Sequence, residues 1–335
     1  MSDPSCYRLA PGVQIVRREQ SVLLVATGAS ASVRVSPGAM VLLPLLSAGC
    51  SVTDLERMLQ SRHPHAPGIS VKLQGFLEPL LRVGLLTIGE AEAGTRRRGA
   101  GWPLLRADPA AHWLAQRLLR VPPFLCWGAL LTLVLLAFAG VAQLALARHL
   151  LHAPAMVAHF NLAGALAFAL LVVPVHEAGH ALACRMAGAP VGSAGIVLHG
   201  YLVPGPYVET SQAYLVSGRW ARFWIPAAGP LVNLLGAGGA AWIALLAGAS
   251  HPDVAAAAIY TVMLCLMWVV FDTNPLGPTD GSHMLEALLD DELARRNALG
   301  LRGMRAPERR AALLYRGAAF LHVVCSSALM YVWLG

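Results

Sequence analysis

The segment VHEAGHALAC (residues 175–184) places two histidines and a glutamate inside an apolar run. His176 and His180 are four residues apart, so on a helix they share one face, about 6 Å apart along the axis, a spacing that lets two imidazoles bind one metal ion. Glu177 stands beside the first histidine, where a carboxylate can take a proton from a water activated by the metal. Histidine and carboxylate ligands make zinc the first candidate for that metal. The alternative is a histidine and glutamate cluster that only bridges helices.

The composition is that of a membrane protein. Of the 335 residues, 56% are hydrophobic and 13% are charged, whereas a soluble domain carries about 25% charged residues. The net charge of +7 comes from arginines that flank apolar segments, a pattern that indicates orientation in a membrane rather than a nucleic-acid surface. The six cysteines occur singly, which favours neither a disulfide framework nor a thiolate metal site. We therefore expect contact with a lipid bilayer and none with nucleic acid.

Five segments are long and apolar enough to cross a bilayer core of about 30 Å. They are residues 122–146, 161–184, 224–248, 254–272 and 312–334. Arginines are frequent in alternate loops, which predicts a cytoplasmic N-terminus and a C-terminus outside. On this topology His176 lies roughly 22 Å into its span from the outer side, near the cytoplasmic face. We expect a multi-pass protein of a bacterial inner membrane.

A catalytic zinc site normally has three protein ligands, so a third must come from elsewhere in the chain. The candidates are His199, Glu209, Asp272, Asp280 and His283. The fourth span, entered from outside, ends at the depth of the histidines, and the stretch after it, DTNPLGPTDGSHML (272–285), is broken by two prolines and a glycine. Depth therefore favours residues 272–283, although spacing alone does not choose among them.

Changes in composition predict three parts of the chain. Residues 1–88 are expected to form a soluble domain, residues 89–121, which begin with GEAEAGTRRRGAG, a linker, and residues 122–335 the membrane domain.

The N-terminal domain combines predicted strands with predicted helices. Alternating patterns at 13–26 and 31–36 predict short strands, and the apolar pattern of 36–60 predicts helices broken at Gly49. Ser51, followed three residues later by Asp54, is typical of a helix start. A further helix is predicted over 70–86.

Three motifs, in this order, resemble the site-2 protease class of intramembrane zinc metalloproteases, and more closely its branch of peptide zinc metalloproteases. They are HEAGH in a spanning helix, AAGPLVNLL (227–235) and NPLGPTDG (274–281). The resemblance covers about residues 160–290 and implies hydrolysis of a peptide bond near the cytoplasmic face, with Asp280 as the third zinc ligand and Glu177 as the general base. It also implies substrate-binding roles for Asn233, Asp272 and Asn274.

Two positions depart from the pattern of that class. The class has Leu-Asp-Gly where this chain has TDG (279–281), and an asparagine where this chain has Asp272. By the resemblance, that asparagine holds the backbone of the substrate, so the departure bears on substrate positioning and removes no metal ligand. For Asn233 the alternative role is helix packing, together with the glycines and proline around it.

The stretch VGSAGIVLHGYLVPGPYVETS (191–211) alternates β-branched residues with glycine and proline. A loop of this length is expected to contain strands of its own. The resemblance implies a re-entrant hairpin whose exposed edge pairs with an extended substrate, either a peptide or a segment of a membrane protein. His199 is a candidate for a transient fourth ligand, although a lone histidine near glycines is more often a surface residue. The alternative is a plain cytoplasmic loop.

The order of strands and helices in residues 1–88 resembles the PqqD-like winged-helix module, which binds leader peptides in peptide-modification systems. The resemblance implies that a leader peptide adds as a strand beside residues 31–36 and lies against the third helix. The alternative is a domain that only anchors or stabilises the membrane part.

Together these features predict an α-helical polytopic membrane protein, with about five spanning helices, a re-entrant hairpin and a small N-terminal α+β winged-helix-like domain. Two functions compete. One is a zinc metalloendopeptidase acting in the maturation or export of a ribosomally made peptide, and the other is a non-catalytic membrane component of a peptide-modification or export system. The intact HEAGH together with Asp280 favours the enzyme.

Overall fold

The computed structural model describes most of the chain in eleven segments. They are residues 6–17, 22–26, 32–35, 39–62, 64, 67–89, 101–147, 160–199, 203–292, 294–299 and 306–334. The chain divides into two compact units, and each is treated separately. The first consists of residues 1–104, 195–205 and 209–215, and the second of residues 105–194, 206–208 and 216–335.

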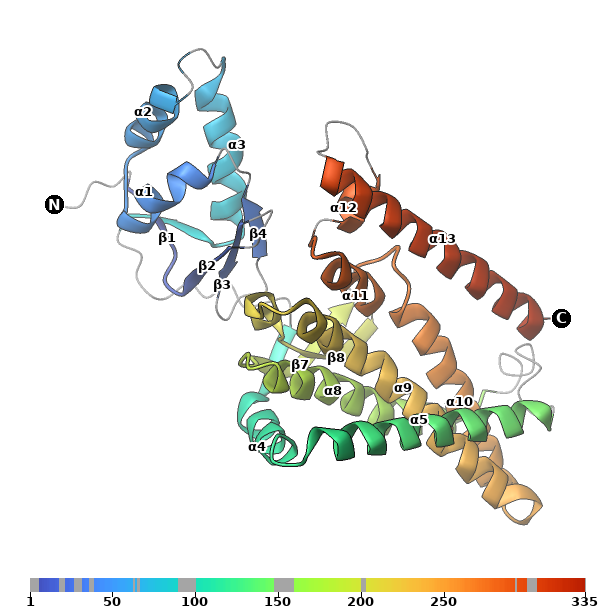
Figure 1. Ribbon diagram of the computed structural model, residues 1–335. Helices are drawn as coiled ribbons and strands as arrows, with labels where there is room; N and C mark the ends of the chain where they lie inside the picture. Colours follow the sequence, from blue (N-terminus) through green and yellow to red (C-terminus); the bar gives the residue numbers. More distant parts are fainter. Residues whose placement is uncertain are drawn as a thin grey trace. The chain divides into compact units, whose positions relative to one another are not determined.

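The first unit contains a small domain of strands and three helices (Figure 1). Its strands are β1 (Tyr7–Leu9), β2 (Val13–Arg17), β3 (Val22–Ala26), β4 (Ser32–Val35) and β5 (Leu86–Ile88). Strands β2, β3 and β4 form an antiparallel sheet in that order, and β1 pairs with β5 in a second sheet. The strands expected at 13–26 and 31–36 are therefore present, whereas β1 and β5 had no strong signal in the sequence.

The helices of this domain follow the predicted order. A 3₁₀ turn, η1 (Met40–Leu42), leads into α1 (Leu43–Ala48), which is followed by α2 (Val52–Arg62) and α3 (Ile69–Arg82). Gly49 ends α1 with a φ of 90°, a conformation that glycine adopts without strain. At the start of α2 the Ser51 backbone N–H donates to Asp54, and the Asp54 backbone N–H donates to the Ser51 hydroxyl. The predicted helix start and the break at Gly49 are both confirmed.

The core of the domain is made of large apolar side chains. Leu24, Leu46, Leu55, Leu73 and Leu80 are all at most 1% exposed. Every residue of β3 is buried. This strand is the central one of its sheet and also contacts η3 (Ser211–Leu215), a turn that follows much later in the chain.

Among its described residues, the second unit contains five helices that are long and apolar enough to cross a membrane. They are α5 (Pro123–Leu146), the continuous segment of α7 (Leu162–Ala167), η2 (Phe168–Val172) and α8 (Val173–Met186), then α9 (Arg219–Ala247), α10 (Pro252–Asp272) and α13 (Ala306–Leu334). The five predicted spans are confirmed to within two residues at most ends, but α9 begins five residues earlier than predicted, at Arg219, and α13 begins six residues earlier, at Ala306. The segment η2 is a π-helical turn directly before the HEAGH helix, and such turns are frequent at functional sites.

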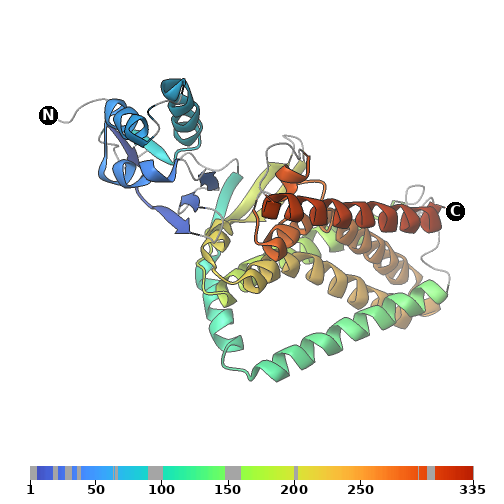
Figure 2. The same cartoon turned by 45° about the horizontal axis from the view of Figure 1, so that its top comes forward.

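Helix α9 is the centre of this unit. It packs against α5, α8, α10 and the short helix α11 (Asp280–Leu289), and Figures 1 and 2 show it running between them. Small residues allow the close approach. A Cβ on Gly238 of α9 would lie 2.2 Å from the Cα of Ala137 on α5, and one on Gly140 of α5 would lie 2.9 Å from Trp242 of α9. These contacts are typical of helix packing in membranes, where small residues bring backbones together.

The region predicted as a linker, residues 89–121, contains regular structure. Strand β6 (Gly101–Arg106) joins β7 (Ser193–His199) and β8 (Val203–Val208) in a sheet of order β6–β7–β8, and α4 (Asp108–Leu118) follows β6. The Asp108 carboxylate accepts hydrogen bonds from Arg185 (2.5 Å) and from the Val191 backbone N–H (2.8 Å). Burial would raise the pKa of Asp108, but these two donors and the charge of Arg185 lower it. The linker prediction was too long because it rested on composition, and these contacts are made by residues distant in sequence.

Helix α12 (Ala294–Leu299) and the 3₁₀ turn η4 (Gly248–Ser250) complete the described elements. The stretch 191–211 contains two strands, as expected. They extend β6 into a three-stranded sheet, a pairing that the sequence did not predict.

Candidate metal centre

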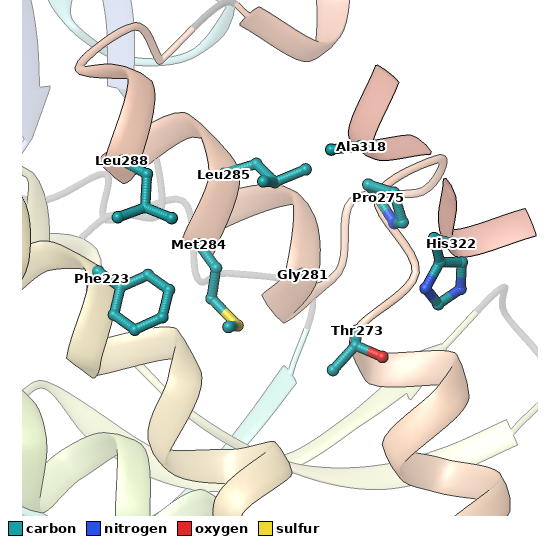
Figure 3. A pocket seen from close by; sticks show the side chains of 9 residues that line it. All are labelled: Phe223, Thr273, Pro275, Gly281, Met284, Leu285, Leu288, Ala318 and His322. Atoms are coloured by element: carbon teal, nitrogen blue, oxygen red, sulfur yellow. The ribbon is translucent and has the colours of Figure 1, made fainter. Parts of the chain in front are cut away.

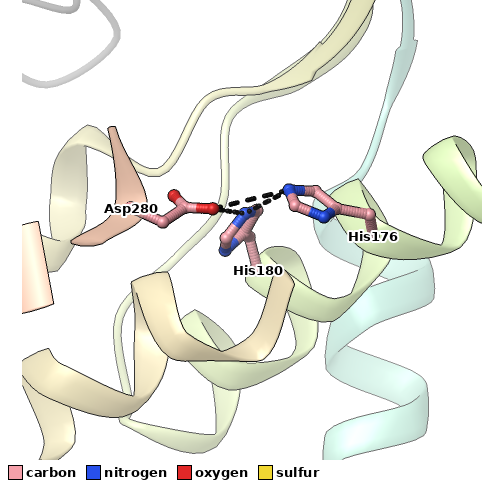
Figure 4. A group of neighbouring side chains, drawn as sticks. All are labelled: His176, His180 and Asp280. Atoms are coloured by element: carbon pink, nitrogen blue, oxygen red, sulfur yellow. Dashed lines mark hydrogen bonds and ion pairs between the residues drawn. The ribbon is translucent and has the colours of Figure 1, made fainter. Parts of the chain in front are cut away.

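The two histidines of HEAGH lie on one face of α8, as their spacing predicts. Both side chains are buried, and their Nε2 atoms are 3.1 Å apart (Figure 4). The Nδ1–H of His180 donates to the Ile225 carbonyl of α9 at 2.8 Å. This bond fixes the ring so that Nε2 carries the free lone pair and faces His176.

Asp280 reaches the same point from a distant part of the chain. Its Oδ2 lies 3.5 Å from Nε2 of His176 and 3.3 Å from Nε2 of His180. Figure 4 shows the carboxylate directed at both rings. Among the described residues, these three form the one group of histidine, cysteine or carboxylate side chains whose ligand atoms all lie within 4.8 Å of one another.

The start of α11 positions Asp280. Asp280 is the first residue of the helix, and Thr279 before it is the N-cap. The hydroxyl of Thr279 accepts from the Ser282 backbone N–H (3.5 Å), and the Ser282 hydroxyl accepts from the Thr279 backbone N–H (3.2 Å), which makes a capping box. The departure from Leu-Asp-Gly at Thr279 is thus a helix cap that holds the neighbouring carboxylate.

The turn between α10 and α11 is fixed by further hydrogen bonds. Thr279 donates to the Asn274 carbonyl, and the side-chain oxygen of Asn274 accepts from the Leu276 backbone N–H at 3.0 Å. Tyr315 of α13 donates to the Pro275 carbonyl at 2.6 Å. The resemblance implies that Asn274 binds substrate. Its amide oxygen, however, accepts a hydrogen bond within its own turn.

The donor set fits a zinc ion. Tetrahedral zinc with bonds of about 2.0–2.1 Å places neighbouring ligand atoms roughly 3.3 Å apart, and the three separations here are 3.1, 3.3 and 3.5 Å. Gly229 of α9 leaves the space open, because a Cβ there would lie 2.4 Å from Nε2 of His180 and 2.5 Å from Nε2 of His176. The three side chains would therefore hold the metal through two imidazole nitrogens and one carboxylate.

Asp280 is ionised at neutral pH. Burial would raise the pKa of its carboxyl, but the adjacent His176 and His180 lower it to about 2. An ionised carboxylate is the form that binds a divalent cation.

Glu177 is partly buried and held by strand β8. The backbone N–H of Val208 donates to its Oε2 at 2.9 Å. No described residue forms a hydrogen bond with the other oxygen of Glu177, Oε1. The carboxylate is therefore anchored at one oxygen.

The other candidates for the third ligand make different contacts or have side chains outside the described residues. Glu209 accepts from the Ser211 hydroxyl (3.3 Å), and His283 contacts Glu286 (3.2 Å). The side chain of His199 lies outside the described residues. Asp272 approaches His176 from the side of Nδ1, 3.7 Å away, and accepts from the Asn233 amide at 2.8 Å. The structure therefore brings Asp280 to the two histidines and places Asp272 with Asn233 behind the first of them.

Sequence reasoning missed two contributors to this site. Gly229 was considered only for helix packing, and the Ile225 carbonyl was not considered at all. The glycine lies in AAGPLVNLL and carried a signal in that motif, but a backbone carbonyl has none, because every residue has one.

An apolar pocket of about 200 Å³ lies beside the site, between α9, α11 and α13 (Figure 3). It reaches Gly281 and Thr273, which follow Asp280 and Asp272 in the sequence. The complete lining is Phe223, Thr273, Pro275, Gly281, Met284, Leu285, Leu288, Ala318 and His322. Only Thr273 and His322 offer polar side chains to it.

Comparison with known proteins matches part of the chain to a protein family. No curated protein and no solved structure matches the chain. The five apolar helices support a multi-pass membrane protein. Residues 163–266, which include both histidines, Glu177 and Gly229 and end before Asp280, match the model of peptidase family M50, and this match supports metalloprotease chemistry.

Proposed function

We propose that this chain is an intramembrane zinc metalloprotease that hydrolyses a peptide bond near the cytoplasmic face of a bacterial inner membrane. One observation carries the proposal: Nε2 of His176, Nε2 of His180 and Oδ2 of Asp280 lie 3.1–3.5 Å from one another beside Glu177. A cytoplasmic N-terminus, indicated by the arginine distribution, belongs to the same proposal.

Each side chain has a defined part in this reaction. His176, His180 and Asp280 would hold the metal, which supplies Lewis acidity and lowers the pKa of water. Glu177 takes a proton from the attacking water and delivers it to the leaving amine, as a general base and then a general acid. The Val208 N–H fixes one oxygen of Glu177, so the other is the oxygen that exchanges the proton.

The hairpin offers an edge to the substrate. Strand β8 is the last strand in the order β6–β7–β8, so its outer edge has no partner strand among the described residues. A peptide in an extended conformation can add to such an edge by backbone hydrogen bonds. The helix of a membrane-protein substrate would have to unwind first, because a helix shields its peptide bonds.

A ribosomally made peptide is the proposed substrate, in its maturation or export. Strand β4 is an edge strand of the sheet β2–β3–β4, and a leader peptide would add beside it and lie against α3. The domain would thereby recognise the precursor that the membrane unit cuts. Binding of a synthetic leader peptide to the full-length chain, and its loss on deletion of residues 1–88, would test this part.

The Glu177→Gln variant tests the enzymatic reaction. The variant keeps every proposed ligand and removes the base, so it should bind zinc as the wild type does and lose cleavage by at least about 100-fold. Zinc content of the purified full-length chain is measured by elemental analysis. Cleavage is followed by mass spectrometry of a library of unstructured peptides, because an extended chain needs no unwinding.

Glu56→Gln, a substitution in α2 of the N-terminal domain, is the matched control and should cleave like the wild type. Equal cleavage by wild type and Glu177→Gln would contradict the assigned base. A wild-type chain that binds zinc but cleaves no peptide would favour a non-catalytic membrane component.

A further inference from the structure

The two metal-facing histidines differ in how their outer nitrogens are satisfied. In His180, Nδ1–H donates to the Ile225 carbonyl at 2.8 Å. In His176, Nδ1 is buried and has no hydrogen-bond partner among the described residues. A buried imidazole nitrogen without a partner is costly, and a ligand histidine normally donates its second N–H to a carbonyl or a carboxylate.

A carboxylate lies directly behind His176. Oδ2 of Asp272 is 3.7 Å from Nδ1, on the side of the ring away from Asp280. Asp272 is the last residue of α10, so it reaches the ring from a different helix than either histidine or Asp280. The distance exceeds a hydrogen bond by about 0.7 Å, so the carboxylate and the ring would have to approach each other slightly for Nδ1–H to donate.

Asn233 holds this carboxylate in place. Its side-chain N–H donates to Oδ2 of Asp272 at 2.8 Å, and the asparagine is 0% exposed. Because Asn233 stands on α9 one turn beyond Gly229, the same helix leaves room for the metal and positions the group behind its ligand. The oxygen that accepts from Asn233 has a second lone pair for the Nδ1–H of His176.

We propose that Asp272 is a positioning residue for His176: its carboxylate accepts the Nδ1–H, and Asn233 orients the carboxylate. This contact fixes the tautomer with the lone pair on Nε2 and makes that nitrogen a stronger ligand. The inference rests on the proposed metal site. It gives Asp272 a part in metal binding, in contrast to the substrate-binding role implied by the resemblance.

The side chain at position 272 should be charged for this role. An asparagine at 272 would have nearly the same shape and could still accept one hydrogen bond, but it would lack the negative charge that polarises the imidazole. An alanine would remove the acceptor and would also leave the buried amide of Asn233 without a partner. The expected order of zinc affinity is therefore wild type, then Asp272→Asn, then Asp272→Ala.

Zinc affinity of the full-length chain in detergent, measured by competition with a chelator, tests the proposal. We expect a roughly tenfold loss in Asp272→Asn and up to about 100-fold in Asp272→Ala. Asp253→Asn, an exposed aspartate in the first turn of the same helix, is the matched control and should bind zinc like the wild type. Cobalt substitution adds a spectroscopic readout. The visible absorption should keep its ligand-field pattern in Asp272→Asn but change in Asp280→Asn, which removes a ligand.

Each outcome decides one question. Unchanged zinc affinity in Asp272→Asn overturns the positioning role. A loss of zinc affinity that is accompanied by a loss of thermal stability in the metal-free chain also overturns it, since that result indicates a structural role only. A cobalt spectrum altered in Asp272→Asn as in Asp280→Asn overturns it by making Asp272 a direct ligand. A wild-type chain that binds no zinc refutes the proposed function itself, which separates that failure from this one.

Discussion

The core of the N-terminal domain consists of large side chains, whereas the helices around the metal centre approach one another through small ones. In the first region leucines fill the space between a sheet and three helices. In the second, glycine and alanine of α9 lie against α5, α8 and α10, and the imidazoles of His176 and His180 lie at Gly229. In the core of the N-terminal domain, burial of large side chains stabilises the fold. At the metal centre, the missing methyl group at Gly229 leaves space between the two histidines for a metal ion.

The largest effect is expected from adding that methyl group. In Gly229→Ala the new Cβ would lie within 2.5 Å of both ring nitrogens, so the histidines must move and zinc affinity should fall by more than about 100-fold. Gly239→Ala, on the same helix with no atom within 4 Å of the added Cβ, is the control and should bind zinc normally. Zinc content and chelator competition measure both. Normal zinc binding by Gly229→Ala would remove the contrast between the two regions.

The opposite change, a loss of volume, should matter most in the N-terminal core. Leu46 is 0% exposed, and Leu46→Ala should destabilise the domain by about 2–5 kcal/mol through lost burial and a residual cavity. Val71→Ala, at a position 73% exposed, should change the free energy of opening by less than about 0.5 kcal/mol. Hydrogen exchange of β3 amides in the full-length chain reports this free energy. Zinc affinity should stay the same, and a parallel loss of zinc would mean that the two regions are not energetically separate.

The smallest effect is expected at a helix cap that both regions contain. Ser51 and Thr279 each cap a helix with a capping box, of α2 and α11 respectively. Ser51→Ala and Thr279→Ala should each cost about 1 kcal/mol of local stability. Only Thr279→Ala should also weaken zinc binding, by up to about tenfold, because the next residue is Asp280. Equal zinc affinity in the two variants would show that the cap does not position the ligand.

The parts of the fold with a local signal were predicted well. The spans follow from the length of apolar runs, and the helix start at Ser51 follows from side chains three residues apart. The strand pairs β1–β5 and β6–β7 join segments about 80 to 90 residues apart, and nothing local specifies such partners. For the same reason the linker was predicted to extend through β6 and α4.

The candidate site divides in the same way. The pairing of His176 with His180 was visible in the sequence because one helix turn carries both. Of the five candidates for the third ligand, depth favoured those in residues 272–283, spacing did not choose among them, and resemblance to a family pointed to Asp280. Asp272 was assigned to substrate, whereas its carboxylate lies behind His176 and accepts from Asn233. The direction of the Asp272 side chain depends on where α10 ends against α9, and a single sequence does not specify that position.

By itself, the sequence determined which segments are apolar enough to cross a membrane and which helix carries a pair of imidazoles, because hydropathy and helical periodicity are properties of neighbouring residues. Only the tertiary structure decided that Asp280 faces both Nε2 atoms, that Gly229 leaves the space between them open, and that Asp272 stands at the outer nitrogen of His176. These contacts join α8, α9, α10 and α11, and their geometry is set by the packing of four helices rather than by any one of them.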